Sequence, residues 1–337
     1  MDPALMAVSI RSILVGLGGL CLVAWAVVPI PPLPVSAQTQ VQPAADTSAV
    51  VEELTVVGTP PGPALWRVKR GESEVVILGG LAPLPHMLQW SSPRLDRALT
   101  GANRLLVPPQ EQLRLTDLPG MALRMASLRQ PFGHTLEGDL SPALRQRFVR
   151  TRESLGIGPG RYSKWKPAIA GFLLIADFRE KQGLSTGKPT TTVIRRAKAL
   201  GVKVQPMADV SWGAMVKSAS AMKTATHEAC LSAALDDLDA EAARARPLAS
   251  AWAAGDLATV KRGMTANLLD QCLLQLPSAT ALLDSGTRQS VDAINAALAK
   301  PGKTVAIIDL KFLLRSGGVL DRLKAQGADV SVPREGE

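Results

Sequence analysis

Two short apolar runs near the start of the folded region are separated by a polar turn. Residues 65–69 and 74–79 are rich in apolar and β-branched side chains and flank an Arg-Gly pair, a pattern typical of a β-hairpin. A helix is expected at residues 94–100, and the apolar run at residues 104–107 then predicts a third strand. The N-terminal part of the folded region is therefore expected to supply strands to a sheet.

Helical spacing dominates residues 141–299. The alanine-rich stretch at residues 209–270 is expected to be mostly helical, with breaks near Pro247 and Gly255, because proline lacks a backbone N–H and glycine disfavours helix interiors. A helix and a short strand are expected to precede this stretch, at residues 190–200 and 202–205.

Strand patterning returns near the C-terminus. Residues 304–308 predict a buried strand, residues 317–326 a last helix, and residues 328–332 a last strand. Strands at both ends of the folded region thus enclose a helical middle. We expect an α/β fold of the α+β kind, in which a small central sheet is built from N- and C-terminal strands.

The apolar run at residues 13–28 precedes several prolines and then small residues. This pattern is typical of a signal peptide cleaved before Gln38, and it predicts a periplasmic or secreted protein. The alternative is a membrane anchor formed by residues 12–35. Cys21 follows a leucine rather than a small residue, so we do not expect lipid attachment there.

The expected organisation of the chain has four parts. They are the signal peptide or anchor, a flexible linker rich in Gln, Thr, Ala and Pro, a single folded domain, and a short tail, at residues 1–37, 38–63, 64–332 and 333–337.

Basic residues outnumber acidic ones, 38 to 29, which gives the chain a formal net charge of +9. Outside the cytoplasm such a surface favours an anionic envelope ligand or a protein partner, and no nucleic acid is expected. Membrane contact is expected only through the N-terminal segment. The alanine-rich helices offer small-residue packing surfaces that are compatible with a homodimer.

Histidine and cysteine are scarce, with three of each, which excludes a multi-cysteine zinc cluster. His134, Glu137 and Asp139 form a His-x-x-Glu-x-Asp motif that could bind a metal or act as base and acid; the alternative is a solvated loop. His86 is a further candidate ligand. The run from His227 to Cys230 begins like a zinc-protease helix, but the second histidine of that motif is missing.

Cys230 and Cys272 remain after the expected processing of the N-terminus. In an oxidising compartment two cysteines on adjacent helices most simply form a disulfide. Free buried thiols are the alternative.

Two segments carry a distinctive framework of glycine, tryptophan and proline. A Leu-Trp strand leads to the run from Gly79 to Pro85 and then to Trp90, and near the C-terminus residues 309–312 precede a Gly-Val-Leu helix start. These segments resemble the signatures of the TraB/GumN family, which includes the Tiki-like proteins. The resemblance extends over about residues 64–332.

The resemblance implies a metal or catalytic site made of two histidines and a glutamate, and this chain departs from it. The first histidine position holds Ala82 and the second holds Phe312, whose motif glycine is replaced by Asp309. The glutamate position aligns with Pro108. Alanine and phenylalanine have no lone pair to offer a metal.

We therefore expect an exported, catalytically inactive protein that acts by binding or regulation in the cell envelope, with no metal or cofactor. Its binding groove is expected at the ends of the strands, with contacts from Gly79, Gly80, Lys311 and Arg315. The alternative is a metal-dependent, peptidase-like hydrolase that uses residues outside the family motifs, namely His86, His134 and Glu137.

Overall fold

The computed structural model describes residues 62–108, 110–112, 125–211, 219–264, 268, 271–272 and 277–331. The expected signal peptide or anchor, nearly all of the linker and the tail lie outside these residues. Within the described ranges, no helix combines the length and the apolar character needed to cross a membrane.

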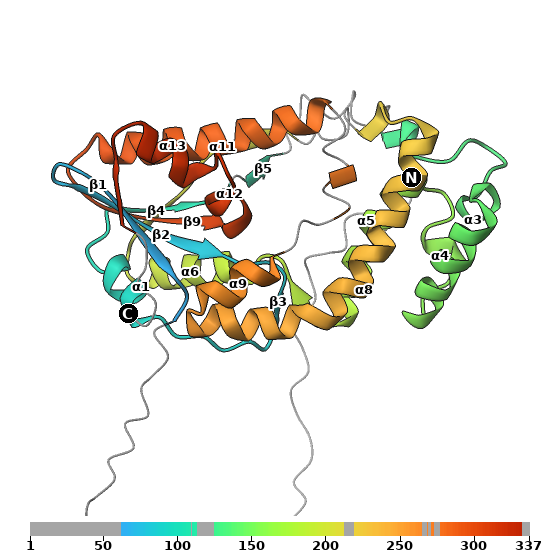
Figure 1. Ribbon diagram of the computed structural model, residues 1–337, viewed down its shortest axis with the longest axis horizontal. Coiled ribbons are helices and arrows are strands. Elements are labelled where there is room, and N and C mark those ends of the chain that lie inside the picture. The colour runs from blue at the N-terminus through green and yellow to red at the C-terminus, as the bar shows by residue number, and fades with distance from the viewer. Residues whose placement is uncertain are drawn as a thin grey trace, which may run out of the picture. The chain divides into compact units, whose positions relative to one another are not determined.

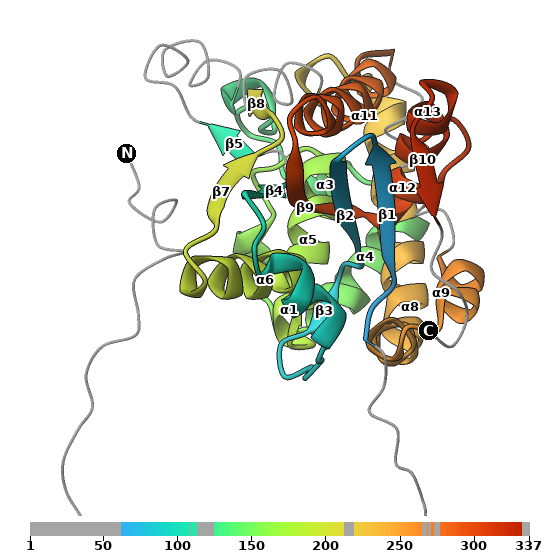
Figure 2. The ribbon, with the colours of Figure 1, turned by 90° about the vertical axis from the view of Figure 1, so that its left-hand side faces the viewer.

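A six-stranded mixed sheet lies at the centre of the fold (Figure 2). The strand order is β10-β1-β2-β9-β4-β7, in which β2, β9, β4 and β7 are parallel and β1 is antiparallel to both of its neighbours. The strands are β1 (Leu65–Arg70), β2 (Ser73–Gly80), β4 (Arg104–Val107), β7 (Lys203–Pro206), β9 (Gly302–Asp309) and β10 (Asp329–Ser331). The expected α+β fold is confirmed, with one strand from the helical middle added to the sheet.

Helices cover both faces of this sheet, which explains why β2 and β9 are almost continuously buried. Helices α11 (Pro277–Leu298) and α13 (Val319–Ala325) lie on one face, and α1 (Pro93–Leu99) and α6 (Lys188–Ala199) lie on the other (Figure 1). The β1–β2 hairpin turns at Gly71, whose φ of 55° favours glycine.

A second hydrophobic cluster is formed by helices from the middle of the chain. It contains α4 (Pro142–Ser154), α5 (Pro167–Lys181) and part of α8 (Thr224–Ala254), with the short α3 (Leu136–Asp139) and the 3-10 turn at Pro159–Arg161 beside them. Gly171 of α5 allows a close approach to α8, because an added Cβ there would lie 3.0 Å from the Cβ of Ala234. Phe148 and Tyr162 pack edge to face, with centroids 5.5 Å apart.

The expected break near Pro247 is wrong, because α8 continues through this residue and ends at Ala254. Proline removes one backbone hydrogen bond from a helix without always ending it, and it commonly leaves a bend. Helix α8 does change direction along its length (Figure 1). Gly255 follows in the left-handed conformation that commonly ends helices, so the expected end there is confirmed.

The predicted disulfide is present between Cys230 of α8 and Cys272, and their Cα atoms lie 5.4 Å apart. Two short two-stranded pairs lie outside the central sheet. They are β3 (Leu84–Pro85) with β6 (Leu184–Ser185), and β5 (Gln110–Gln112) with β8 (Asp209–Ser211).

Candidate functional site

A pocket lies beside the carboxyl ends of two parallel strands. The ends of β2 and β9 are adjacent, with Gly80 paired to Asp309. The loop after β2 and the start of α12 (Leu310–Leu314) form one wall of the pocket, and α5, α8 and α9 (Leu257–Gly263) supply the other. The carboxyl ends of parallel strands are a common place for binding sites, since loops and helix ends converge there.

The pocket is small and has mixed polarity. Its volume is about 60 Å³, which is room for about two water molecules or for one small polar group of a larger ligand. Leu81, Leu248 and Met264 give it apolar surface. The pocket lining also includes one residue at an expected family-site position and four charged residues. They are Ala82, Arg179, Glu241, Arg244 and Lys311.

Arg179 and Glu241 form a two-pronged ion pair in the pocket wall. Arg179 Nε donates to Glu241 Oε1 at 2.8 Å, and its Nη2 donates to Oε2 at 2.6 Å. Both carboxylate oxygens are therefore bonded, and the Glu241 side chain is only 10% exposed. Arg244 and Lys311 add two further positive charges to the lining. The lining side chains thus carry three positive charges and one negative charge, a net charge of +2 that favours an anion.

The structure separates the four residues expected to bind a ligand. Lys311 lines the pocket, whereas Gly79 and Gly80 are buried within β2, where the Gly79 carbonyl accepts a hydrogen bond of 2.8 Å from Trp252 Nε1. Arg315 donates to Thr287 Oγ1 at 2.6 Å, and it is not among the residues that line this pocket.

The residues at the expected family-site positions have structural contacts of their own. Ala82 lines the pocket with a methyl group, and Phe312 packs against the core around the sheet. The Asp309 carboxylate caps α12 by accepting from the Lys311 N–H at 2.8 Å. Pro108 directly follows β4.

These residues do not fit the metal site that the resemblance implies. Of the four, only Asp309 carries a metal-binding side chain, and that side chain serves as a helix cap. Across the described ranges, no three His, Cys, Asp or Glu side chains come together closely enough to hold a metal ion.

The alternative catalytic residues lie in two unrelated loops. The backbone N–H of His86 donates to the Gly183 carbonyl at 2.7 Å, and its own carbonyl accepts from Lys188 Nζ. The His134 ring is exposed, and its Nδ1 lies 3.0 Å from Asp139 Oδ1. Neither histidine lines the pocket at the strand ends.

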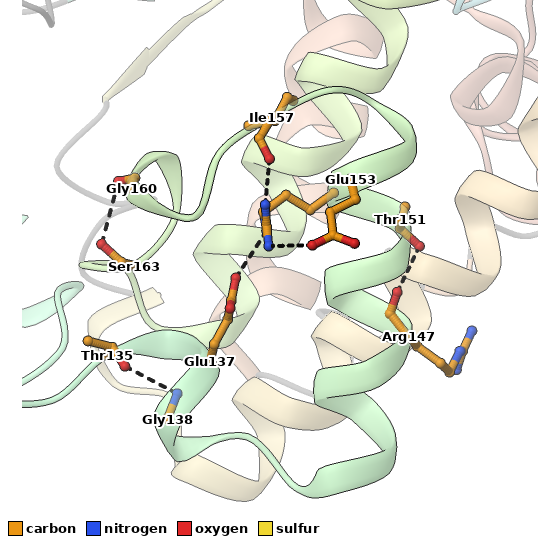
Figure 3. A network of polar contacts seen from close by, with 10 residues as sticks. Thr135, Glu137, Gly138, Arg147, Thr151, Glu153, Ile157, Gly160 and Ser163 are labelled. Atoms are coloured by element: carbon orange, nitrogen blue, oxygen red, sulfur yellow. Dashed lines mark hydrogen bonds and ion pairs between the residues drawn. The ribbon is translucent and has the colours of Figure 1, made fainter.

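Glu137 belongs to a network around a buried arginine (Figure 3). Arg152 is 5% exposed, and its Nε donates to Glu137 Oε1 at 3.0 Å. The same guanidinium donates to the Ile157 carbonyl at 2.6 Å and to Glu153 at 3.4 Å. Because a buried cation needs a partner, the contacts of Glu137 assign it a structural role.

His227 is the third histidine and lies buried on α8, three residues before Cys230 of the disulfide. It is 2% exposed, and neither ring nitrogen has a hydrogen-bond partner. Burial, with a smaller contribution from Lys166, lowers the pKa of His227 to about 4. The imidazole is therefore neutral at pH 7.

Sequence reasoning missed Arg179, Glu241 and Arg244. Glu241 and Arg244 lie one turn apart on α8, a spacing that places them on one face. Arg179 is 62 residues from Glu241 in the chain, and no local pattern connects the two. Their meeting depends on the packing of α5 against α8.

Comparison with known proteins gives one match. The model of the TraB/PrgY/gumN family matches residues 64–332. No curated protein and no solved structure matches the chain. The chain therefore belongs to the TraB/PrgY/gumN family, as the resemblance of its motifs indicated.

Proposed function

We propose that this member of the TraB/PrgY/gumN family is exported and binds a small anionic group in the pocket at the strand ends, without catalysing a reaction there. The observation that supports this most is the composition of the pocket wall. Arg179, Arg244 and Lys311 line it, and Glu241 already has both oxygens bonded to Arg179.

Hydrolysis requires a nucleophile or an activated water, and the pocket residues are poor candidates for either role. A general base must reach the proton that it abstracts, but the Glu241 carboxylate is held by two short hydrogen bonds. Ala82 contributes a methyl group where the resemblance expects a metal ligand. We therefore infer that the family scaffold is retained here for binding or regulation.

An anionic group suits both the charge and the size of the pocket. Guanidinium and ammonium groups bind carboxylates and phosphates through charge-assisted hydrogen bonds. The volume of about 60 Å³ admits such a head group, while the rest of the ligand would lie against the apolar rim. In the cell envelope, this chemistry corresponds to a carboxylate- or phosphate-bearing molecule.

The binding proposal is tested by thermal unfolding of the full chain with inorganic phosphate or acetate as the probe. We expect each probe to raise the midpoint, since a ligand that binds only the folded state stabilises it. Arg244→Gln and Lys311→Gln should weaken the effect, and Ala82→Tyr should abolish it by filling the pocket. Arg195→Gln is the control, because Arg195 is exposed on α6 and does not line the pocket.

Two results would contradict the binding proposal. The first is an absence of any shift with either probe, and the second is an equal shift in the pocket variants and the control. The non-catalytic part is tested by elemental analysis and a peptidase and esterase screen. Near-stoichiometric metal, with turnover lost on chelation or in His86→Ala or His134→Ala, would overturn it.

Export is tested separately, by N-terminal sequencing of the protein isolated from its cell. We expect the mature chain to begin at Gln38 and to fractionate outside the cytoplasm. Recovery of intact residues 1–37 would instead support the anchor formed by residues 12–35.

A further inference from the structure

The most exposed large apolar side chain in the described structure is Phe132, at 106% relative exposure. It lies in a turn in which the His134 N–H donates to the Pro131 carbonyl at 3.1 Å. Gly133 follows Phe132 with a φ of 82°, which is the third-position geometry of a type II turn. Phe132 therefore sits at the apex of a defined turn.

This turn is held in place by a second segment, residues 161–166. Arg129 and Trp165 form an isolated β-bridge, and the Gln130 N–H donates to the Lys164 carbonyl at 2.9 Å. On the other side of the turn, the Leu136 N–H donates to the Ser163 carbonyl at 2.9 Å. Figure 3 shows Thr135 and Ser163 on neighbouring segments of this part of the fold. These backbone contacts with residues 161–166 thus hold in place the turn that exposes the Phe132 ring.

Basic and aromatic groups flank Phe132 on these two segments. The Arg129 guanidinium lies 4.6 Å from the centroid of the Trp165 ring, and Trp165 is itself partly exposed. Lys164 is exposed, and neither Arg129 nor Lys164 has an ion-pair partner among the described residues.

The acidic groups of this region are already engaged by other side chains. Asp139 contacts His134, and Glu137 is bonded to Arg152. Asp177 accepts two hydrogen bonds from Arg161, at 3.0 and 2.8 Å, and one from another side chain. Residues 129–166 carry eight lysine and arginine side chains and three acidic ones, so the local field around the turn is positive, in agreement with the net charge of the whole chain.

We propose that Phe132, Trp165, Arg129 and Lys164 form a surface, here called the Phe132 surface, that docks on an anionic lipid bilayer. An apolar ring at a loop apex can enter the acyl boundary while lysine and arginine contact the head groups. Tryptophan side chains favour the interface between the acyl chains and the head groups of the bilayer. This contact is additional to the one expected of the N-terminal segment.

A bilayer explains this arrangement better than a soluble anion or a protein does. A soluble polyanion would use Arg129 and Lys164 but would gain nothing from a phenylalanine that points away from the fold. A protein interface usually buries its aromatic anchor among other apolar residues, whereas the immediate neighbours of Phe132, Pro131, Gly133 and His134, form a narrow exposed turn.

The test compares Phe132→Trp with Met87→Trp in the full chain. Met87 is the matched control because it is also highly exposed, at 83%, but lies in the loop after β3. Each variant is mixed with phosphatidylcholine vesicles, with or without phosphatidylglycerol, that carry brominated acyl chains. Both variants share the same N-terminal segment, so any anchoring through it affects them equally.

Trp165 and the other native tryptophans are common to both variants, so the readout is the quenching beyond that of the unsubstituted chain. We expect this additional quenching in Phe132→Trp and not in Met87→Trp, and only when phosphatidylglycerol is present. In sedimentation with unbrominated vesicles, Lys164→Glu should lower the partition coefficient about 30-fold, since it changes the surface charge by two units. Lys198→Glu, at an exposed position of α6, should lower it much less.

Three outcomes would overturn the proposal. They are equal quenching at positions 132 and 87, quenching that does not depend on phosphatidylglycerol, and equal losses in Lys164→Glu and Lys198→Glu. Binding of a soluble acidic polysaccharide that Lys164→Glu abolishes and Phe132→Ser leaves unchanged would assign the surface to that ligand instead. Circular dichroism confirms that each variant is folded before it is measured.

Discussion

Two adjacent glycines at the carboxyl end of β2 differ sharply in the space around them. A Cβ added at Gly79 would overlap the Leu310 side chain and would lie 2.6 Å from Trp66 Cζ3. At Gly80 the nearest side-chain atom, Ile307 Cγ2, would lie 3.6 Å away, which is ordinary van der Waals contact. Gly79→Ala and Gly80→Ala therefore form a matched pair of variants.

The loss of stability expected for Gly79→Ala depends on whether the neighbouring side chains can move aside. Leu310 and Trp66 are 1% and 0% exposed, so neither can move outward to make room for a methyl group. Overpacking of this kind typically costs about 1–3 kcal/mol. Neither glycine has a positive φ, so backbone strain adds nothing. Gly80→Ala should be neutral or should stabilise by up to about 1 kcal/mol, because alanine restricts the unfolded chain.

Urea denaturation followed by far-ultraviolet circular dichroism measures both free energies of unfolding. We expect Gly79→Ala to lower the midpoint with an unchanged denaturant dependence, and Gly80→Ala to leave it unchanged or raise it. Equal effects of the two substitutions, or a neutral Gly79→Ala, would show that Leu310 and Trp66 do not pack against Gly79 as described.

Three further predictions concern the helical cluster. Since the pKa of His227 is lowered to about 4 from 6.5, the unfolded state takes up a proton that the folded state does not as the pH falls between these values. The free energy of unfolding should therefore fall by up to about 3 kcal/mol over that range, and His227→Leu should remove this slope in urea titrations at pH 7 and pH 4. Tyr162→Phe removes the hydrogen bond of 2.7 Å to Asp177 and should cost about 1–2 kcal/mol; a thermal midpoint equal to that of the unmodified chain would contradict this. Reduction of the Cys230–Cys272 bridge, whose cysteines are 42 residues apart, should cost about 4 kcal/mol, as measured by unfolding with and without dithiothreitol.

Local patterns were sufficient to predict most of the sheet. The hairpin of β1 and β2, the helix α6 and the strand β7 each depend on neighbouring residues, through apolar runs and glycine turns. The disulfide was also predicted, because two cysteines on adjacent helices most simply pair in an oxidising compartment. Pro247 misled the prediction because a proline in a long, well-packed helix need not end it.

The pocket wall could not be predicted in the same way. Arg179 and Glu241 meet because α5 packs against α8, and that packing depends on small residues such as Gly171 and Ala234 rather than on any motif of the charged residues. Lys311 lines this pocket and Arg315 does not, for a similar reason. Arg315 lies four positions after Lys311, but it follows the end of α12 and bonds to Thr287.

The electrostatics of the pocket make the two functional hypotheses mutually exclusive at this position. A divalent cation beside Arg179, Arg244 and Lys311 would be repelled by three charges, and among the pocket-lining residues only Glu241, whose carboxylate is already paired, would attract it. An anion would instead be attracted by the three cations and repelled by Glu241. The geometry of the strand ends, by contrast, is set by the backbone register of β2 and β9, and it does not require a bound ion. The pocket can therefore exist without metal ligands, provided that its ligand is an anion rather than a cation.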